Sequence, residues 1–121
     1  MPILGTCYFI CVRIIARSTL TRFIEKLDGH KDQRAVKAAL ESWFQEARQA
    51  QWKNSSDVKG SYANASIVGA DRVVFNIKGN AYRLVVSVNY RRGALFIKWL
   101  GTHKEYDKID VRTVQYAPET H

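Results

Sequence analysis

The sequence predicts an α+β domain in which two helices pack on one face of an antiparallel sheet. Apolar residues recur at helical spacing between about residues 18 and 51. Between about residues 72 and 100 they follow strand patterns instead, in short runs separated by turn sequences rich in Gly and Asn. Helices followed by a series of strands favour an α+β arrangement over the parallel sheet that alternating strands and helices would form.

The first part of the chain predicts one short strand and two helices. Residues 13–16 are expected to form the strand, and Ser18 is the expected N-cap of the helix that follows. Gly29 suits the left-handed residue that ends this helix, and a longer helix is expected from about residue 32 to 51. The side chains expected on the buried faces are Leu20, Phe23, Ile24, Leu27, Val36, Ala39, Leu40, Trp43, Phe44 and Ala47.

The second part predicts strands joined by short connections. Residues 52–71 are polar, with an apolar island at 65–68 that is expected to hold a short strand. Alternation then predicts strands at 72–78, 81–90 and 94–100.

Turn and cap residues complete this prediction. Gly79 and Asn80 both tolerate positive φ and predict a tight hairpin. Thr102 and Glu105 have the spacing of a capping box, which predicts a short C-terminal helical turn.

A chain of 121 residues with 46% hydrophobic content is expected to form one domain, which we place at residues 13–117, with a tail at 118–121. Residues 1–12 are apolar and aperiodic, and we interpret them as an extension from a start site assigned too far upstream; an extra strand or a membrane-associating tail is the alternative. No run reaches the roughly 18 apolar residues of a membrane span. Cys7 and Cys11 lack the further ligands of a zinc site, so we expect no metal and a cytoplasmic protein without crosslinks.

The charge predicts a polyanionic partner. The chain has 19 Lys and Arg against 11 Asp and Glu, a formal net charge of +8. Between residues 72 and 108 only Glu105 and Asp107 oppose the basic side chains. Those basic residues are Arg72, Lys78, Arg83, Arg91, Arg92, Lys98, Lys104 and Lys108. Charge alone does not distinguish RNA from DNA or from an acidic protein.

Several classes of enzyme find no support in the sequence. The glycine pattern matches neither a phosphate-binding loop nor a dinucleotide fingerprint, and no serine nucleophile elbow is present. No paired carboxylates lie beside a strand at the spacing that glycoside hydrolysis needs. The chemistry that remains is cationic and aromatic.

The run from 101 to 107 (GTHKEYD) holds the best acid–base candidates. His103 can accept and donate protons near neutrality, although an ordinary histidine at a helix start would look the same. Tyr106 lies three residues on and shares its face, where it could stack on a base, donate a proton or simply pack. Lys104 is more easily a phosphate contact than a proton carrier.

Strands and turns supply the other candidates. Arg83 lies in mid-strand, where its planar fork of donors could stabilise charge developing on a scissile phosphate. Lys78 and Lys98 could converge on the same sheet face, or could only discourage pairing at an edge. We treat Asn80 as a turn residue that could touch a nucleic acid. Arg91 and Arg92, in the last turn, are also candidate nucleic-acid contacts.

Two motifs, VVFNIKGNAYRLVV at 73–86 and GTHKEYD at 101–107, resemble the HigB family of RelE-like toxins. The resemblance extends over about residues 13–113 and implies a RelE-like fold. It also implies metal-independent cleavage of mRNA in the ribosomal A site, by attack of a 2′-hydroxyl on the adjacent phosphate. The expected partners are mRNA and a HigA-type helix-turn-helix antitoxin, with no cofactor.

Two other interpretations remain open at this point. A non-catalytic RNA- or DNA-binding module could use the same basic sheet for adhesion alone, and an inert homologue could survive as a partner-binding protein. A neighbouring reading frame encoding a helix-turn-helix protein would favour the toxin.

Overall fold

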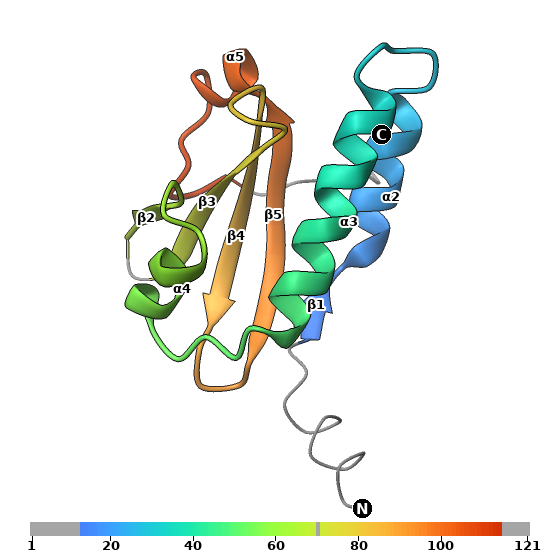
Figure 1. Cartoon of the computed structure of the whole chain (residues 1–121). Coiled ribbons are helices and arrows are strands. Elements are labelled where there is room, and N and C mark those ends of the chain that lie inside the picture. The colour runs from blue at the N-terminus through green and yellow to red at the C-terminus, as the bar shows by residue number, and fades with distance from the viewer. Residues whose placement is uncertain (1–12, 70, 115–121) are drawn as a thin grey trace, which may run out of the picture.

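A computed structural model describes residues 13–69 and 71–114 (Figure 1). Five strands form one sheet in the order β1-β5-β4-β3-β2, with α2 (Arg17–Lys26) and α3 (Gln33–Gln49) along one face. The predicted α+β class is confirmed. The sheet is mixed because β1 (Arg13–Ile15) runs parallel to β5, while the other neighbours are antiparallel. The expectations for residues 1–12 and 115–121 lie outside the described residues.

The two predicted helices are present, with one wrong boundary. The residue at the N-cap of α2 is Ala16, which makes no side-chain cap bond, and Ser18 lies inside the helix. β1 ends at Ile15, so the chain enters the helix without a loop in which Ser18 could act as a cap. Gly29 adopts a φ of 83°, as its place after α2 predicted. The predicted stripe on α3 is buried against the sheet at Val36, Leu40, Trp43, Phe44 and Ala47, with Ala39 partly buried.

A short helix, α4 (Ser55–Ser61), lies in the connection that was predicted to hold only a strand. Asn54 caps it by accepting a hydrogen bond from the Asp57 amide at 2.9 Å. Only Val58 of this helix is buried, so seven residues present no periodic pattern to recognise. The expected strand follows as β2 (Ser66–Val68).

The remaining strands are β3 (Arg72–Ile77), β4 (Tyr82–Asn89) and β5 (Ala94–Thr102). Their side chains facing α2 and α3 form the core: Val73, Phe75, Ile77, Tyr82, Leu84, Val86, Val88, Leu95, Ile97 and Leu100. The pairing of β4 with β5 shifts between Val85, opposite Trp99, and Val86, opposite Ile97. Lys98 is therefore the extra residue of a β-bulge. In a regular strand, Ile97 and Leu100 would point to opposite faces of the sheet, because they are three residues apart. The bulge shifts the alternation by one residue, so both side chains enter the core.

The hairpin between β3 and β4 differs from the predicted tight turn on Gly79 and Asn80. Pairing ends at Ile77 with Tyr82, which leaves a four-residue loop at 78–81. The positive φ values fall at Lys78 (53°) and Gly79 (64°), one residue earlier than expected. Ile77 and Tyr82 are both buried, so burial decides the register and the turn adapts to it.

The end of the described chain is held to the sheet by a buried arginine. Arg72 is only 9% exposed, and its Nη1 donates to the carbonyl of Val111 at 3.1 Å and of Val114 at 2.7 Å. These bonds satisfy the buried guanidinium and tie the segment after α5 to β3. Arg72 is therefore part of the fold and does not offer its charge to a ligand.

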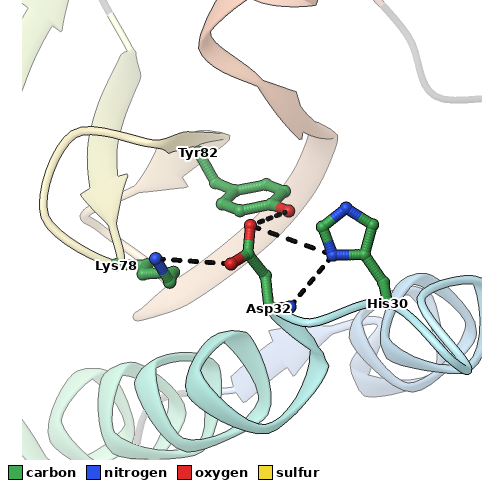
Figure 2. Close-up of polar contacts among 4 residues, drawn as sticks. All are labelled: His30, Asp32, Lys78 and Tyr82. Atoms are coloured by element: carbon green, nitrogen blue, oxygen red, sulfur yellow. Dashed lines mark hydrogen bonds and ion pairs between the residues drawn. The ribbon is translucent and has the colours of Figure 1, made fainter.

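Asp32, at the start of α3, joins the helical layer to the hairpin (Figure 2). Its Oδ2 accepts a hydrogen bond from the Tyr82 hydroxyl at 3.2 Å, and its Oδ1 lies 3.5 Å from Lys78 Nζ. His30 Nδ1 accepts from the Asp32 amide at 2.9 Å, which places the imidazole beside the carboxylate. Burial acts to raise the pKa of Asp32, but the Tyr82 hydrogen bond and the Lys78 charge outweigh it and hold the pKa below 3.8.

We predict that Asp32 contributes to acid sensitivity. Its folded-state pKa is depressed, so its stabilising effect is complete above 3.8 and is lost as the pH falls through the lowered value. Urea unfolding of wild type and Asp32→Asn, above and below that pH, should show the wild type losing more stability on acidification. Asp28→Asn, which changes an exposed carboxylate in the same loop, is the control and should behave as wild type. Equal acid losses in wild type and Asp32→Asn would contradict the assignment.

Candidate active site

The candidate site lies on the sheet face opposite α2 and α3, at the end where β5 leads into α5 (His103–Tyr106) (Figure 1). Arg83 on β4 pairs with Gly101 on β5, so the arginine and the start of α5 lie at one level of the sheet. The β-bulge places Lys98 and Trp99 outside the core on β5, and Lys98 Nζ lies 5.8 Å from the centre of the Phe96 ring.

Trp99, Tyr106 and Arg83 are in contact and will be called the aromatic–arginine cluster. The ring centres of Trp99 and Tyr106 are 6.2 Å apart with a 51° tilt. The guanidinium carbon of Arg83 lies 5.7 Å from the centre of the Tyr106 ring, within cation–π range. Arg83 Nη1 also donates to the Asn80 carbonyl at 3.0 Å, which fixes the direction of the fork.

Gly101 makes this cluster possible. A Cβ at this position would lie 2.6 Å and 2.7 Å from two atoms of the Trp99 ring and 2.8 Å from Glu105 Oε1. Carbon atoms do not approach so closely, so the Trp99 ring occupies space that any other residue would fill. The φ of Gly101 does not fall in the left-handed region, so its backbone conformation does not require glycine. Glycine is required because a side chain would collide with the Trp99 ring.

The short helix α5 presents His103 and Lys104. The predicted capping box is confirmed, since the Glu105 amide donates to Thr102 Oγ1 at 3.2 Å and the Thr102 amide donates to Glu105 Oε1 at 2.9 Å. The His103 amide donates to the Ala81 carbonyl at 2.9 Å, which attaches α5 to the hairpin loop. The His103 side chain is 47% exposed, and its Nε2 lies 3.8 Å from Asp107 Oδ2, an ion pair when the imidazole is protonated.

Residues 36–109 match the HigB toxin family, described as the RelE-like toxic component of a toxin–antitoxin system. The chain belongs to this family. The matched region runs from α3 to just beyond α5 and contains every residue of the candidate site. No curated protein matches the chain. As the toxic component of such a system, the toxin has an antitoxin as its partner.

Lys78 is the clearest departure from the predicted site. Its ammonium lies beside Asp32 on the helical side of the sheet, whereas Lys98 lies with Phe96 outside the core. Of the two alternatives for these lysines, convergence on one face is not what the structure has. The left-handed conformation of Lys78 ends the strand alternation before this residue.

Three other predicted contacts are not members of the cluster: Asn80 lies beside it, and Arg91 and Arg92 lie at the far end of β4. Asn80 has an exposed side chain and contributes its carbonyl to Arg83. Arg91 and Arg92 are exposed in the turn between β4 and β5, at the end of β4 opposite Arg83. Asn89, at that end, is six positions along the strand from Arg83, roughly 20 Å at 3.3 Å per residue.

Trp99 is the site residue that the sequence analysis missed. Uninterrupted alternation would put it on the same side as Leu95 and Ile97, inside the core. The bulge reverses this and leaves the ring half-buried beside Tyr106. The available signal was the sequence itself, in which Trp99 follows Lys98 and comes two residues before Gly101. Nothing in this run indicates a bulge.

A hollow of about 350 Å³ lies between α2 and α3, away from the candidate site, and is lined by Leu20, Ile24 and Phe44 among others. Single-stranded nucleic acid is bound on open surfaces that combine positive charge with aromatic rings, so an enclosed pocket is not required. Within the described ranges, no three His, Cys, Asp or Glu side chains are grouped so that they could hold a metal ion. Over the same part of the chain, no helix is long and apolar enough to cross a membrane.

We predict that Gly101→Ala displaces the Trp99 ring. Trp43 and Trp52 are buried, so acrylamide quenching of tryptophan fluorescence reports mainly on Trp99. Quenching should increase, and the free energy of unfolding should fall by about 1 kcal/mol, the lower end for overpacked positions. Gly60→Ala, where a Cβ meets nothing within 4 Å, should leave quenching unchanged. The same quenching in both variants would show that Gly101 does not hold the ring.

Proposed function

We propose that this toxin is a metal-independent endoribonuclease of the cytoplasm that cleaves mRNA on the translating ribosome. The observation that carries the proposal is the aromatic–arginine cluster beside the exposed His103. It combines rings on which bases can stack with a directed guanidinium and an imidazole, on a chain of net charge +8. These are the groups that phosphodiester cleavage uses when the RNA supplies its own nucleophile.

In the proposed reaction the 2′-oxygen attacks the adjacent phosphorus and loses its proton, while the bond from phosphorus to the 5′-oxygen breaks. The 5′-oxygen leaves with a proton, so the products are a 2′,3′-cyclic phosphate and a 5′-hydroxyl. Arg83 stabilises the negative charge that develops on the phosphate, and its bond to Asn80 orients the guanidinium beforehand. His103 transfers a proton, and Lys98, Lys104 and Tyr106 are the further groups within the site.

Trp99 and Tyr106 are suited to hold the bases on either side of the scissile phosphate. Both rings are half-buried, so part of each remains exposed. Stacking of a base on an aromatic side chain contributes about 1–3 kcal/mol without sequence preference. Such sequence-tolerant stacking fits an enzyme whose mRNA substrate is already positioned by the ribosome.

The alternative is a non-catalytic RNA- or DNA-binding module. The exposed Arg91 and Arg92 favour it, because they extend the positive charge to the end of the sheet away from the cluster. A binding module would retard translation without generating new RNA ends, which separates the two functions directly.

We predict that Arg83→Ala and His103→Ala each abolish growth arrest while the protein remains folded. Loss of one preorganised charge-stabilising group costs about 100- to 1,000-fold in rate, and loss of a proton-transfer group about 100- to 10,000-fold. Cleavage mapped in a translating extract should persist in EDTA while the ribosomes remain intact, and should leave 2′,3′-cyclic phosphate ends. Arg34→Ala removes the same charge from an exposed position on α3 and should stay toxic.

Full toxicity in a folded His103→Ala protein would move the proton transfer to Lys98, Lys104 or Tyr106. Full toxicity in Arg83→Ala as well would reject this face of the sheet as the site. RNA binding without new ends would support the alternative.

We further propose that the antitoxin is a HigA-type helix-turn-helix protein, with an acidic or amphipathic segment that covers the basic site. Oppositely charged surfaces steer association, and salt screens them. The association rate of toxin and antitoxin should therefore fall as salt rises, which stopped-flow mixing measures. Co-expression with the product of the adjacent gene should relieve growth arrest, and persistent arrest would count against this partner.

A further inference from the structure

The Asp32 carboxylate is used in an unusual way for a residue at a helix N-cap. An aspartate in this position ordinarily accepts a hydrogen bond from an amide in the first turn. Asp32 makes no such bond, although it is the N-cap of α3. Its two oxygens instead contact Lys78, the first residue of the 78–81 hairpin loop, and Tyr82, the residue directly after it (Figure 2). The carboxylate therefore connects the helical layer to both ends of that loop.

The loop in turn supports two parts of the candidate site. The carbonyl of Asn80 accepts the bond that orients Arg83, at 3.0 Å. The carbonyl of Ala81 accepts the bond from the His103 amide, at 2.9 Å. Both carbonyls belong to residues between Lys78 and Tyr82. A shift of the loop moves the guanidinium and the start of α5 together.

The conformation of the loop makes this support necessary. Lys78 is a non-glycine residue in the left-handed region, with a φ of 53°, a conformation that costs free energy unless the surroundings maintain it. The contact between its ammonium and Asp32 is one such restraint. Tyr82 is held by its ring against Phe23, at 5.9 Å between ring centres, and by its hydroxyl on Asp32.

We infer that Asp32 is a positioning residue for RNA cleavage, which acts through the 78–81 loop to hold Arg83 and His103 in their working arrangement. The inference rests on the proposed function, since it assigns Arg83 and His103 to the reaction. Asp32 lies on the helical side of the sheet and touches neither RNA nor the reacting atoms. It also gives Lys78 a different role from the RNA contact that the sequence suggested.

Asp32→Ala tests the inference in a reconstituted ribosome assay. The maximal cleavage rate should fall by about 10- to 100-fold, the scale of a displacement near 1 Å in a catalytic group, while the toxin concentration for half-maximal rate changes little. Asp32→Glu should recover part of the rate, because it keeps a carboxylate within reach of the loop. Asp32→Ala combined with Tyr82→Phe should cost less than the sum of the two, because both remove one hydrogen bond.

Gln33→Ala is the matched control. Gln33 is the next residue on α3, and its side chain donates to the Ile24 carbonyl of α2 at 3.0 Å, away from the hairpin. This variant loses one tertiary hydrogen bond from the same turn and should cleave at the wild-type rate. Equal losses in Gln33→Ala and Asp32→Ala would reduce Asp32 to a general contribution to stability and overturn the inference.

Lys78→Met separates positioning from RNA binding. Positioning predicts a lower maximal rate with an unchanged half-maximal concentration, whereas a phosphate contact predicts the reverse and a weaker salt dependence. The second result would overturn the assignment of Lys78 to the support of the loop.

Hydrogen exchange supplies a measurement that does not depend on catalysis. The His103 amide should exchange at least about fivefold faster in folded Asp32→Ala than in wild type or Gln33→Ala, because its acceptor at Ala81 is less firmly held. If wild type does not cleave RNA, the proposed function fails, and exchange alone decides whether Asp32 holds the loop. If wild type cleaves and Asp32→Ala cleaves equally well, the inference fails and the proposed function stands.

Discussion

The single extra residue in β5 decides which side chains this toxin buries and which it presents. Ile97 and Leu100 can both enter the core only because Lys98 is bulged between them. The same insertion releases Trp99 from the core, and Gly101 then provides the space in which its ring lies against Tyr106. A regular strand would exchange the exposed and buried sets over this stretch and dismantle the cluster. Core packing and the candidate site are thus two outcomes of one irregularity in strand pairing.

The site also depends on parts of the chain that do not touch it. Arg83 and His103 are held through the carbonyls of the 78–81 loop, and that loop is held by a carboxylate from the opposite layer. Such an arrangement attaches Arg83 and His103 to a short connection whose conformation depends on contacts with the helical layer. In the proposed function, groups that act on a large substrate stay accessible, while contacts away from the site determine their orientation.

The sequence was sufficient where periodicity and burial agree. The stripe on α3, Gly29 after α2 and the capping box at Thr102 were all predicted, because each depends on residues close together in the chain. It was insufficient where long-range packing decides: α4 buries one residue and has no pattern, and the bulge at Lys98 has no local signature. The hairpin register follows from burial of Tyr82 and overrides the preference of Gly79 and Asn80. The family motifs indicated the region that holds the candidate site, but they indicated neither Trp99 nor the side of the sheet that Lys78 occupies.

The attachment of the last described segment bears on how this protein can vary. Arg72 holds that segment through the carbonyls of residues 111 and 114, and every amino acid carries such a carbonyl. Substitution at those two positions leaves the acceptors in place, so the segment can drift in sequence without leaving the sheet. Arg72 has no such latitude, because both bonds come from its side chain and its loss would leave the two carbonyls without this donor. Evolutionary constraint at this end of the molecule is therefore concentrated in a strand, some forty residues before the segment that it retains.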